Sequence, residues 1–434
     1  MVSSKAKEKR IARLERELSR IRTSPSLRLG AHITNAMRYP WRAPFLLITL
    51  PWMMLSIGLE MLGRRPTPKG DFNVPSQIYE PNNTVLMFPT NGVGFGHFTR
   101  MLAVAKRMKI QDPSLEIIFF TTMPTLHLLK PYGIAAHHIS GPKYFKNMDS
   151  SNWNALLEEQ LTLCFESHRP KMFVFDGAYP YRGMLRSIST QVQMNKIWLR
   201  RGTFRKGSSI PIDSIGHFDL IIHPEDSVPL AKSEVDHGVE ILHCSPIVLL
   251  DPDEMLTRES ARSRLLLPSD ARVVYVQLGA GEINDIDSEI RMTIEALLRY
   301  EDIHVVIGES MIGERIEMSL DRVHIIRDYP NSMYFNAFDA SVQAGGYNSF
   351  HEVKNIRLPT LFYPNMETGM DDQFARCKIA EKEGWGIVLK SRKMKSIDVA
   401  CSELLSLEST QPDSSFNNGA TELSVKLTNQ EWGG

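Results

Sequence analysis

Short apolar runs rich in β-branched residues alternate with helical stretches along most of the chain, and this alternation constrains the fold more than any other feature. The runs form two series, which begin at TVLMFPT (84–90) and VVYVQLG (273–279). The other predicted strands are EIIFFTT (116–122), KMFVFDG (171–177), KIWLR (196–200), LIIH (220–223), IHVVIG (303–308), VHIIRDY (323–329), ASVQAGG (340–346) and TLFYP (360–364). Strands that alternate with helices build parallel sheets with helices packed on their faces. The sequence therefore predicts an α/β protein with two parallel-sheet domains.

The length of the chain agrees with this division. Its 434 residues are too many for one ordinary core and suit two domains with extensions. Two prolines interrupt the strand–helix pattern in SPIVLLDPDE (245–254), which places the domain boundary there. The predicted parts are a helical N-terminal segment (1–65), a Pro- and Gly-rich linker (66–82), an N-terminal domain (83–247), a C-terminal domain (248–406) and a flexible polar tail (407–434).

Charge is distributed unevenly along the chain. The whole chain has no net charge, which gives no indication of a nucleic-acid partner. Residues 1–70, however, hold 14 Lys and Arg residues against 4 Glu, whereas the remainder holds 36 basic and 46 acidic residues. This asymmetry predicts that the front of the chain binds an anionic surface while the body stays soluble.

Residues 43–62 (APFLLITLPWMMLSIGLEML) are the most apolar stretch. A spanning helix needs about 20 apolar residues, and Pro51 and Glu60 interrupt this one. The flanking arginines and the tryptophans suit a segment that lies at the headgroup level of a membrane. The alternative is a helix packed against the globular body. We expect a cytoplasmic protein that associates peripherally with the inner face of the cell membrane.

Three further features concern the N-terminal sequence and the expected compartment. Residues 5–23 carry an apolar stripe at spacings of three and four, which predicts either a short coiled coil or a solvated helix. The four cysteines are far apart and form no CxxC pair, which argues against a disulfide framework or a zinc site and fits a reducing compartment. No signal peptide is apparent, because the first apolar run begins only near residue 43.

The turn FPTNGVGFGHFTR places three glycines, Gly92, Gly94 and Gly96, between a predicted strand and a predicted helix. Glycines let a backbone turn sharply near a ligand, and the helix start offers free N–H groups. A dinucleotide fingerprint is disfavoured, because the spacing is GxGxGH and the next strand lacks a closing acidic residue. His97 stands at the carboxyl edge of the sheet, where it can act as a general base. The alternative is a histidine that caps the helix.

The segment 338–389 holds the most specific pattern. A strand ends in Gly345-Gly346, and the helix after it contains Glu352. Leu358-Pro359 then leads into another strand, and Asp371-Asp372-Gln373 opens the helix after that. A helix N-terminus after two glycines can receive a diphosphate, and a carboxylate in the next turns can accept the hydroxyl groups of a ribose.

This segment resembles the C-terminal, donor-binding half of the GT-B glycosyltransferases, which have two Rossmann-like domains. The closest pattern is that of the group containing the peptidoglycan UDP-N-acetylglucosamine transferase (glycosyltransferase family 28-like): a small residue with GxxTxxE, then LPxxxxP, then an acidic loop with Gln. The Gly92–His97 turn is similar to the N-terminal GGH loop of that group. The resemblance covers roughly residues 84–392. Two departures are Ser349 in place of Thr and FGHFTR in place of GGHxxP, so the acceptor is expected to differ.

The resemblance implies a set of site residues. Glu352 would hold the ribose, and the nucleobase would lie near Arg327 and Tyr329. The diphosphate would be flanked by Gly345, Gly346, Asn348 and Ser349, and approached by the small-residue loop with Gly279 and Gly281. Asp372 and Gln373 would contact the donor sugar. On the acceptor side the resemblance implies the loop of Gly92, Gly94, Gly96 and Arg100.

The reaction implied by the resemblance is inverting, metal-independent transfer of a sugar from a UDP-sugar to a glycan or lipid-linked acceptor, with no cofactor. His97 is the predicted base, with Asp176 as second choice or as its orienting partner. Two DxD matches, at 251–253 and 285–287, are interpreted as incidental. Three alternatives stay open: a UDP-sugar hydrolase, a UDP-sugar 2-epimerase, and a non-catalytic nucleotide-sugar-binding subunit that anchors a partner at the membrane.

Overall fold

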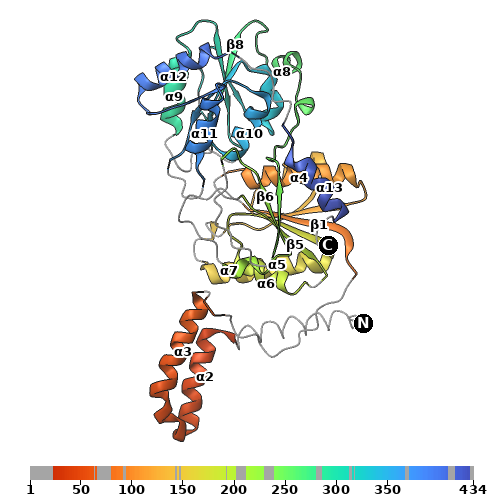
Figure 1. The fold of residues 1–434 in the computed structure, drawn as a ribbon, viewed down its shortest axis with the longest axis vertical. Helices are drawn as coiled ribbons and strands as arrows, with labels where there is room; N and C mark the ends of the chain where they lie inside the picture. The colour runs from red at the N-terminus through yellow and green to blue at the C-terminus, as the bar shows by residue number, and fades with distance from the viewer. Residues whose placement is uncertain are drawn as a thin grey trace. The chain divides into compact units, whose positions relative to one another are not determined.

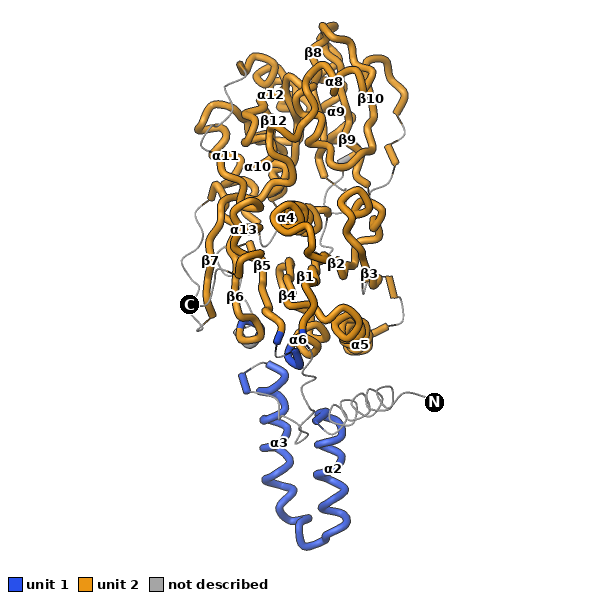
Figure 2. The backbone as a smooth tube through the Cα atoms, turned by 90° about the vertical axis from the view of Figure 1, so that its right-hand side faces the viewer, with its two compact units in different colours: residues 1–80, 189–193, 211–215 blue, residues 81–188, 194–210, 216–434 orange. Residues whose placement is uncertain are grey.

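The computed structural model forms two compact units, made of residues 1–80 with two short segments (189–193 and 211–215) and of the remaining chain (Figure 2). The predicted helix over 5–23 lies almost entirely outside the described residues, as does most of the predicted linker. The residues that the structure describes are 23–62, 64–65, 80–90, 94–141, 144–145, 148–191, 193–201, 212–228, 239–279, 286–311, 315–316, 318–366, 371–408 and 416–430.

The first sheet has seven parallel strands in the order β3-β2-β1-β4-β5-β6-β7. Its central strand β1 is buried from Thr84 to Pro89, because a parallel sheet is covered on both faces. The strands are β1 (Asn82–Pro89), β2 (Glu116–Thr121), β3 (Ala135–His138), β4 (Pro170–Asp176), β5 (Asn195–Leu199), β6 (Leu220–Pro224) and β7 (Glu240–Cys244).

The second sheet has six parallel strands in the order β10-β9-β8-β11-β12-β13. The strands are β8 (Arg272–Gln277), β9 (Ile303–Gly308), β10 (Val323–Ile326), β11 (Ala340–Ala344), β12 (Thr360–Tyr363) and β13 (Gly386–Val388). The α/β class with two parallel sheets, predicted from the sequence, is confirmed.

Each sheet has one switch point. In the first, the chain runs outward from β1 to β3 and then returns to the other side of β1 with β4. In the second, β8 and β11 stand in the same relation. Loops that leave the two strands at such a point diverge, and the crevice between them is where α/β proteins bind ligands. Both Gly-rich turns of the sequence follow strands at these switch points.

Helices cover the sheets, as Figure 1 shows. They are α4 (Gly96–Gln111), α5 (Ser150–His168), α6 (Arg182–Ser189), α8 (Arg258–Arg264), α9 (Ile286–Leu297), α10 (Tyr347–Ile356), α11 (Gln373–Lys382), α12 (Met394–Ser406) and α13 (Gly419–Asn429). The short helix α7 (Ile212–Ile215) belongs to the smaller unit. Short 3₁₀ helices are η2 (Leu126–Tyr132), η4 (Pro252–Glu254) and η5 (Asn331–Ala337).

The prediction of a flexible tail from residue 407 is wrong for helix α13. Asn418 caps this helix, and Leu423 and Leu427 are buried where α13 packs along α4. Asn418 also donates to Asp251, which in turn accepts from Arg107 of α4. Helix α13 is thus fixed against α4, which packs on the first sheet. Asp251, from the first DxD match, accepts hydrogen bonds from both Asn418 and Arg107 and so has a structural role.

The smaller unit contains a helical hairpin made of α2 (Pro25–Arg38), the 3₁₀ turn η1 (Pro40–Phe45) and α3 (Leu46–Met61), drawn in blue in Figure 2. The residues Pro40–Met61 form the one helical segment of the described chain that is long and apolar enough to cross a membrane, with 22 residues and a mean hydropathy of 1.5. Of the residues in α3, only Ile57 is buried.

Candidate active site

The switch point of the first sheet brings together His97 and Asp176. His97 is the second residue of α4, directly after β1, and Asp176 is the last residue of the neighbouring strand β4. The two loops leave adjacent strands at the same edge, so the side chains meet although 79 positions separate them. His97 Nδ1 lies 2.6 Å from Asp176 Oδ1. The sequence prediction that Asp176 partners His97 therefore has the geometry it requires.

Arg100 completes this group from the next turn of α4. Its Nη2 lies 2.8 Å from Asp176 Oδ1 and its Nε lies 3.2 Å from Oδ2. Asp176 is 1% exposed. Burial opposes its ionisation, but Arg100 and then His97 outweigh burial and lower the pKa of Asp176. The carboxylate is therefore ionised and accepts from both neighbours.

The environment of His97 favours its neutral form. Burial lowers the pKa of His97, against the raising effect of Asp176 and with the help of Arg100. Because a carboxylate can only accept, the Nδ1–H group of His97 donates to Asp176, and Nε2 keeps its lone pair. An imidazole held in this tautomer by a buried carboxylate can take a proton from a hydroxyl group at Nε2. This arrangement can perform general-base chemistry near neutral pH.

The switch point of the second sheet places Gly345 and Gly346 between β11 and α10. Gly346 is the N-cap of α10, and Tyr347, Asn348 and Ser349 form its first turn. A Cβ atom at Gly345 would overlap Cys377 of α11, so this position must be glycine for α10 and α11 to approach. Ten helical residues align their peptide dipoles here, and the unpaired N–H groups of the first turn can receive an anion.

Asn348 connects the two switch points. Its Nδ2 donates to the carbonyl oxygen of Gly96 at 3.2 Å, and its Oδ1 accepts from Arg100 Nη1 at 3.5 Å. The start of α10 therefore lies against the start of α4. The predicted base and the predicted diphosphate site are adjacent, although about 250 residues separate them in the chain.

Glu352 lies one turn farther along α10 and is partly exposed. Burial raises the pKa of Glu352 to about 7, and the hydroxyl of Ser332, at 3.4 Å, partly offsets this. A carboxylate has about four acceptor positions, and among the described residues this long bond is the protein hydrogen bond that it receives. Glu352 can accept further donors, as a ribose-binding residue must.

Asp372 and Gln373 are both used by the protein itself. Asp372 caps α11 by accepting from the backbone of Ala375 at 3.0 Å, and Gln373 Oε1 accepts from the backbone of Asn365 at 2.9 Å. The bond to Asn365 fixes which end of the Gln373 amide faces outward. Its NH₂ group is left as the donor for a ligand, so its predicted role remains a prediction.

Arg327 and Tyr329, predicted to lie near the nucleobase, both have partners within the protein, and their predicted role remains a prediction. Arg327 is exposed and pairs with Glu309 at 2.9 Å. The Tyr329 hydroxyl shares a hydrogen bond of 2.9 Å with Thr99 of α4, and its ring packs on Phe95 and Phe98. Tyr329 therefore joins the two halves of the site by packing.

The glycines of the other loops are less informative. Gly279 has a φ of 104°, a left-handed conformation that favours glycine where β8 ends. Gly94 lies in the turn before α4, and Gly96 is the first residue of that helix. Gly92 and Gly281 lie outside the described residues, as does Asp285 of the second DxD match.

A group of charges surrounds Tyr347, the first residue of α10, and three of its members, Arg201, Asp226 and Arg376, were not predicted from the sequence. Three guanidinium groups lie 5.5 to 5.7 Å from its ring centroid, and each also pairs with an aspartate. The pairs are Arg100 with Asp176, Arg201 with Asp371, and Arg376 with both Asp226 and Asp371. Asp226 follows β6 at the carboxyl edge of the sheet, and this position was the one signal in the sequence that could have identified it.

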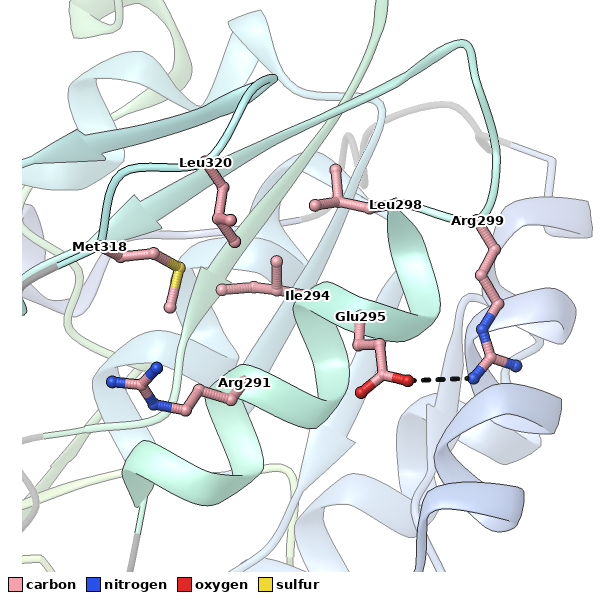
Figure 3. A pocket seen from close by; sticks show the side chains of 7 residues that line it. All are labelled: Arg291, Ile294, Glu295, Leu298, Arg299, Met318 and Leu320. Atoms are coloured by element: carbon pink, nitrogen blue, oxygen red, sulfur yellow. Dashed lines mark hydrogen bonds and ion pairs between the residues drawn. The ribbon is translucent and has the colours of Figure 1, made fainter.

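A separate hollow of about 500 Å³ lies on the second sheet's half, beside α9 (Figure 3). The Glu295 carboxylate in it faces Arg299, with which it forms an exposed ion pair. Its lining residues are Arg291, Ile294, Glu295, Leu298, Arg299, Met318 and Leu320. None of the predicted site residues lines this hollow.

No protein-family model matches the chain, and no curated protein sequence matches it. Solved structures do. The spinosyn forosaminyltransferase SpnP is 12% identical, with 80% of this chain and 94% of that chain covered and a TM-score of 0.53. MurG of Acinetobacter baumannii is also 12% identical, with 80% and 99% covered and a TM-score of 0.51. The spinosyn rhamnosyltransferase SpnG complexed with thymidine diphosphate is 15% identical, with 80% and 95% covered and a TM-score of 0.50.

The chain has the GT-B fold. The resemblance seen in the Gly-rich segments is thereby confirmed at the level of the fold. In GT-B terms, the sheet of β1 to β7 belongs to the N-terminal half and the sheet of β8 to β13 to the C-terminal half. His97 and Asp176 come from the N-terminal half and Glu352 from the C-terminal half.

Proposed function

We propose that the protein is an inverting glycosyltransferase that moves a sugar from a nucleoside diphosphate to an acceptor hydroxyl group. The observation that carries this proposal is the contact of Asn348 with Gly96 and Arg100. This contact supports the proposal, because it sets the start of α4, which carries His97, beside the N-terminus of α10. Deprotonation of an acceptor and stabilisation of a leaving anion can then occur at one place.

The donor half of the proposal follows from α10. The diphosphate would accept from the N–H groups of Gly346, Asn348 and Ser349, and the ribose hydroxyl groups would donate to Glu352. Among the neighbours in fold, SpnG has been seen with thymidine diphosphate. We propose a UDP-sugar for this chain, UDP-GlcNAc or a related hexose, on the strength of the Gly-rich pattern that resembles the peptidoglycan transferase group.

The reaction would be a single displacement. His97 Nε2 removes the proton of the acceptor hydroxyl, whose oxygen forms a bond to the anomeric carbon from the side opposite the diphosphate. The bond from that carbon to the diphosphate oxygen breaks, and its electron pair leaves with the diphosphate. The N-terminus of α10 stabilises the negative charge that develops there. Attack from the opposite side inverts the anomeric centre.

The test is release of free UDP from UDP-sugars, measured with and without lipid-linked or glycan acceptors. Acceptor-dependent release that His97→Ala abolishes is the expected result. Release of UDP at the same rate with and without acceptor would instead identify a UDP-sugar hydrolase. Conversion of the sugar into its epimer without release of UDP would identify the epimerase. Binding of nucleotide without either reaction would leave the anchoring subunit. A chelator is expected to have little effect on transfer.

We further propose that residues 1–65 hold the protein at an anionic membrane surface, with the acceptor in cell-envelope or extracellular polysaccharide synthesis. The support is the basic N-terminal sequence and the exposed apolar side chains of α3. A lipid-linked acceptor would then be presented at the surface where the enzyme is held.

A further inference from the structure

Helix α3 of the α2–α3 hairpin has a polar side, which faces α2, and an apolar side, which is exposed. The residues of α3 that contact α2 include its polar ones. Thr49 Oγ1 lies 2.8 Å from His32 Nε2, and Glu60 receives two hydrogen bonds from Arg28 at 2.6 and 3.1 Å. Ser56 donates to Glu60 at 3.2 Å. The polar side of α3 is therefore satisfied inside the hairpin.

The opposite side of α3 is apolar and exposed along its whole length. Leu47, Met54 and Met61 follow one another at intervals of seven residues, and their exposed fractions are 84%, 58% and 65%. Residues seven apart lie on nearly the same face of a helix. The other exposed apolar side chains of this face are Ile48, Trp52 and Leu55. An exposed apolar face of this extent marks a surface that binds something apolar.

Helix α2 shows the complementary pattern. Its exposed positions include Ala31, Thr34 and Asn35, which are small or polar, and toward its ends Leu27 and Met37, which are 44% and 74% exposed, while Ala36 is buried. The hairpin is therefore amphipathic as a pair of helices. The exposed side of α3 is apolar, whereas the exposed side of α2 is small or polar in its middle, at Ala31, Thr34 and Asn35, and apolar only at Leu27 and Met37.

Charge identifies the occupant of the apolar face. Arginine pairs flank α3 at both ends, Arg38 and Arg42 before it and Arg64 and Arg65 after it. Glu60 is the one acidic residue between positions 23 and 65, and Arg28 neutralises it. At the turn, the Arg42 guanidinium stacks on Trp41 at 4.7 Å from the ring centroid. Arginine at both ends of an apolar helix, with a tryptophan before it and another within it, suits anionic headgroups above acyl chains.

The dimensions favour a helix that lies in the surface. The 16 residues of α3 alone extend about 24 Å, less than the hydrocarbon thickness of about 30 Å, and the apolar segment Pro40–Met61 reaches spanning length only together with the 3₁₀ turn η1. A spanning orientation would also expose Thr34 and Asn35 of α2 to acyl chains and would separate the two arginine pairs across the bilayer. In the plane, all four arginines reach headgroups of the same leaflet.

We propose that the α2–α3 hairpin lies in the plane of one leaflet of an anionic bilayer, with the exposed face of α3 in the acyl-chain region and the outer face of α2 toward water. This inference rests on the proposed membrane role and specifies its geometry.

The test places a spin label at one position of the full chain at a time, using Leu47→Cys, Met54→Cys, Met61→Cys and, on α2, Ala31→Cys. The native cysteines do not compete, because Cys164, Cys244, Cys377 and Cys401 are all buried. Burial also raises the pKa of Cys164, Cys377 and Cys401 to about 12, so their thiols are unreactive at neutral pH. Accessibility to oxygen and to a polar nickel complex then gives the depth of each label on phosphatidylglycerol vesicles.

The expected result is the same shallow depth at positions 47, 54 and 61, with position 31 in water. A helix that crosses the bilayer would instead change depth by about 10 Å between successive labels, which would overturn the inference while the membrane role stands. Absence of vesicle binding by chains that still bind UDP would overturn both. Absence of UDP binding by the full chain would contradict the proposed catalytic function, and the label depths would still test the orientation of the hairpin.

Two charge-matched variants provide a second, independent measurement. Leu55→Glu puts a carboxylate on the apolar face of α3, and Thr34→Glu puts the same charge on the outer face of α2. Both positions are exposed, and circular dichroism checks that the helices persist. Leu55→Glu should weaken vesicle binding at least tenfold, whereas Thr34→Glu should change it less than threefold. Equal effects would contradict the assigned faces.

Discussion

Asp226 and Arg376 belong to different halves of the GT-B fold, and their side chains meet in a two-armed ion pair. Arg376 Nε lies 2.8 Å from Asp226 Oδ1, and Nη2 lies 2.5 Å from Oδ2. The same guanidinium donates to the Gly345 carbonyl and to Asp371. One buried arginine thus holds the loop before α10, the loop before α11 and the end of β6 in fixed relation.

Removal of Asp226 is expected to destabilise the protein strongly. The side chains of Asp226 and Arg376 are 1% and 0% exposed, so Asp226→Ala leaves a buried cation with fewer partners. Such a change costs about 3 kcal/mol or more in the free energy of unfolding. Urea unfolding followed by fluorescence measures this. Glu295→Ala, which removes an exposed ion pair with Arg299, is the control and should cost under about 1 kcal/mol. Equal costs would mean that the buried pair does not hold the halves together.

Glu352 should make nucleotide binding depend on pH. Its pKa of about 7 is high for a carboxyl group because of burial, and ribose hydroxyl groups bind the ionised form. UDP binding should therefore release a proton near neutral pH and tighten about tenfold from pH 6 to pH 8. Calorimetry in two buffers of different ionisation enthalpy measures the proton. Glu352→Gln should remove the pH dependence, and Glu352→Ala should weaken binding about tenfold or more. Unchanged affinity in both variants would exclude Glu352 from the site.

The same group affects the stability of the free protein. The folded-state pKa of Glu352 lies above the value near 4.5 of an unfolded glutamate. The folded protein therefore binds more protons between about pH 4.5 and 7, and its stability falls as pH rises through that range. In Glu352→Gln, the free energy of unfolding should fall less steeply as pH rises through this range. An unchanged slope would assign the dependence to other groups.

Much of this arrangement could be predicted from the sequence, and the missed parts have physical reasons. The central strands β1, β4, β8 and β11 were predicted to within two residues, because buried parallel strands are continuous apolar runs. The edge strands β3, β7 and β13 were missed, since β3 and β13 have only four and three residues and β3 and β7 are largely exposed. Helix α13 was missed because its polar composition hides the 420, 423 and 427 spacing that packs on α4.

The same distinction holds for the candidate site. Loops that follow central strands could be assigned to one edge of a sheet from the sequence, and His97 with Asp176 was found in this way. Beyond the position of Asp226 after β6, no local pattern marks Asp226 or Arg376, because each is a single charge whose partner lies 150 residues away. Only the approach of the two halves brings them together.

His97 should carry the acid limb of the pH profile of transfer. Burial holds its pKa below 6.5, so the imidazole is neutral at pH 7, and the rate should fall only below about pH 6.5. His97→Ala should lower kcat by about 10²- to 10⁴-fold with donor affinity unchanged. Asp176→Asn keeps the side-chain shape but removes the negative charge that orients Nδ1–H, so its kcat should also fall. A His97→Ala variant with most of its turnover would transfer the role of base to Asp176 or another group.

A chain that begins at Asp71 tests whether membrane binding belongs to the N-terminal unit and UDP binding to the α/β unit. It lacks the hairpin and the basic N-terminal sequence but keeps every described residue of the candidate active site. We expect it to be soluble and to bind UDP with the affinity of the full chain.

Basic residues near an anionic bilayer each contribute about 1 kcal/mol before screening, and the apolar face of α3 adds burial. Co-sedimentation of the full chain with anionic vesicles should therefore weaken as salt rises, and the shortened chain should not bind at either salt concentration. Equal binding by both chains would place the membrane contact on the α/β body. Binding of the full chain that resists both salt and carbonate would instead make Pro40–Met61 a spanning helix.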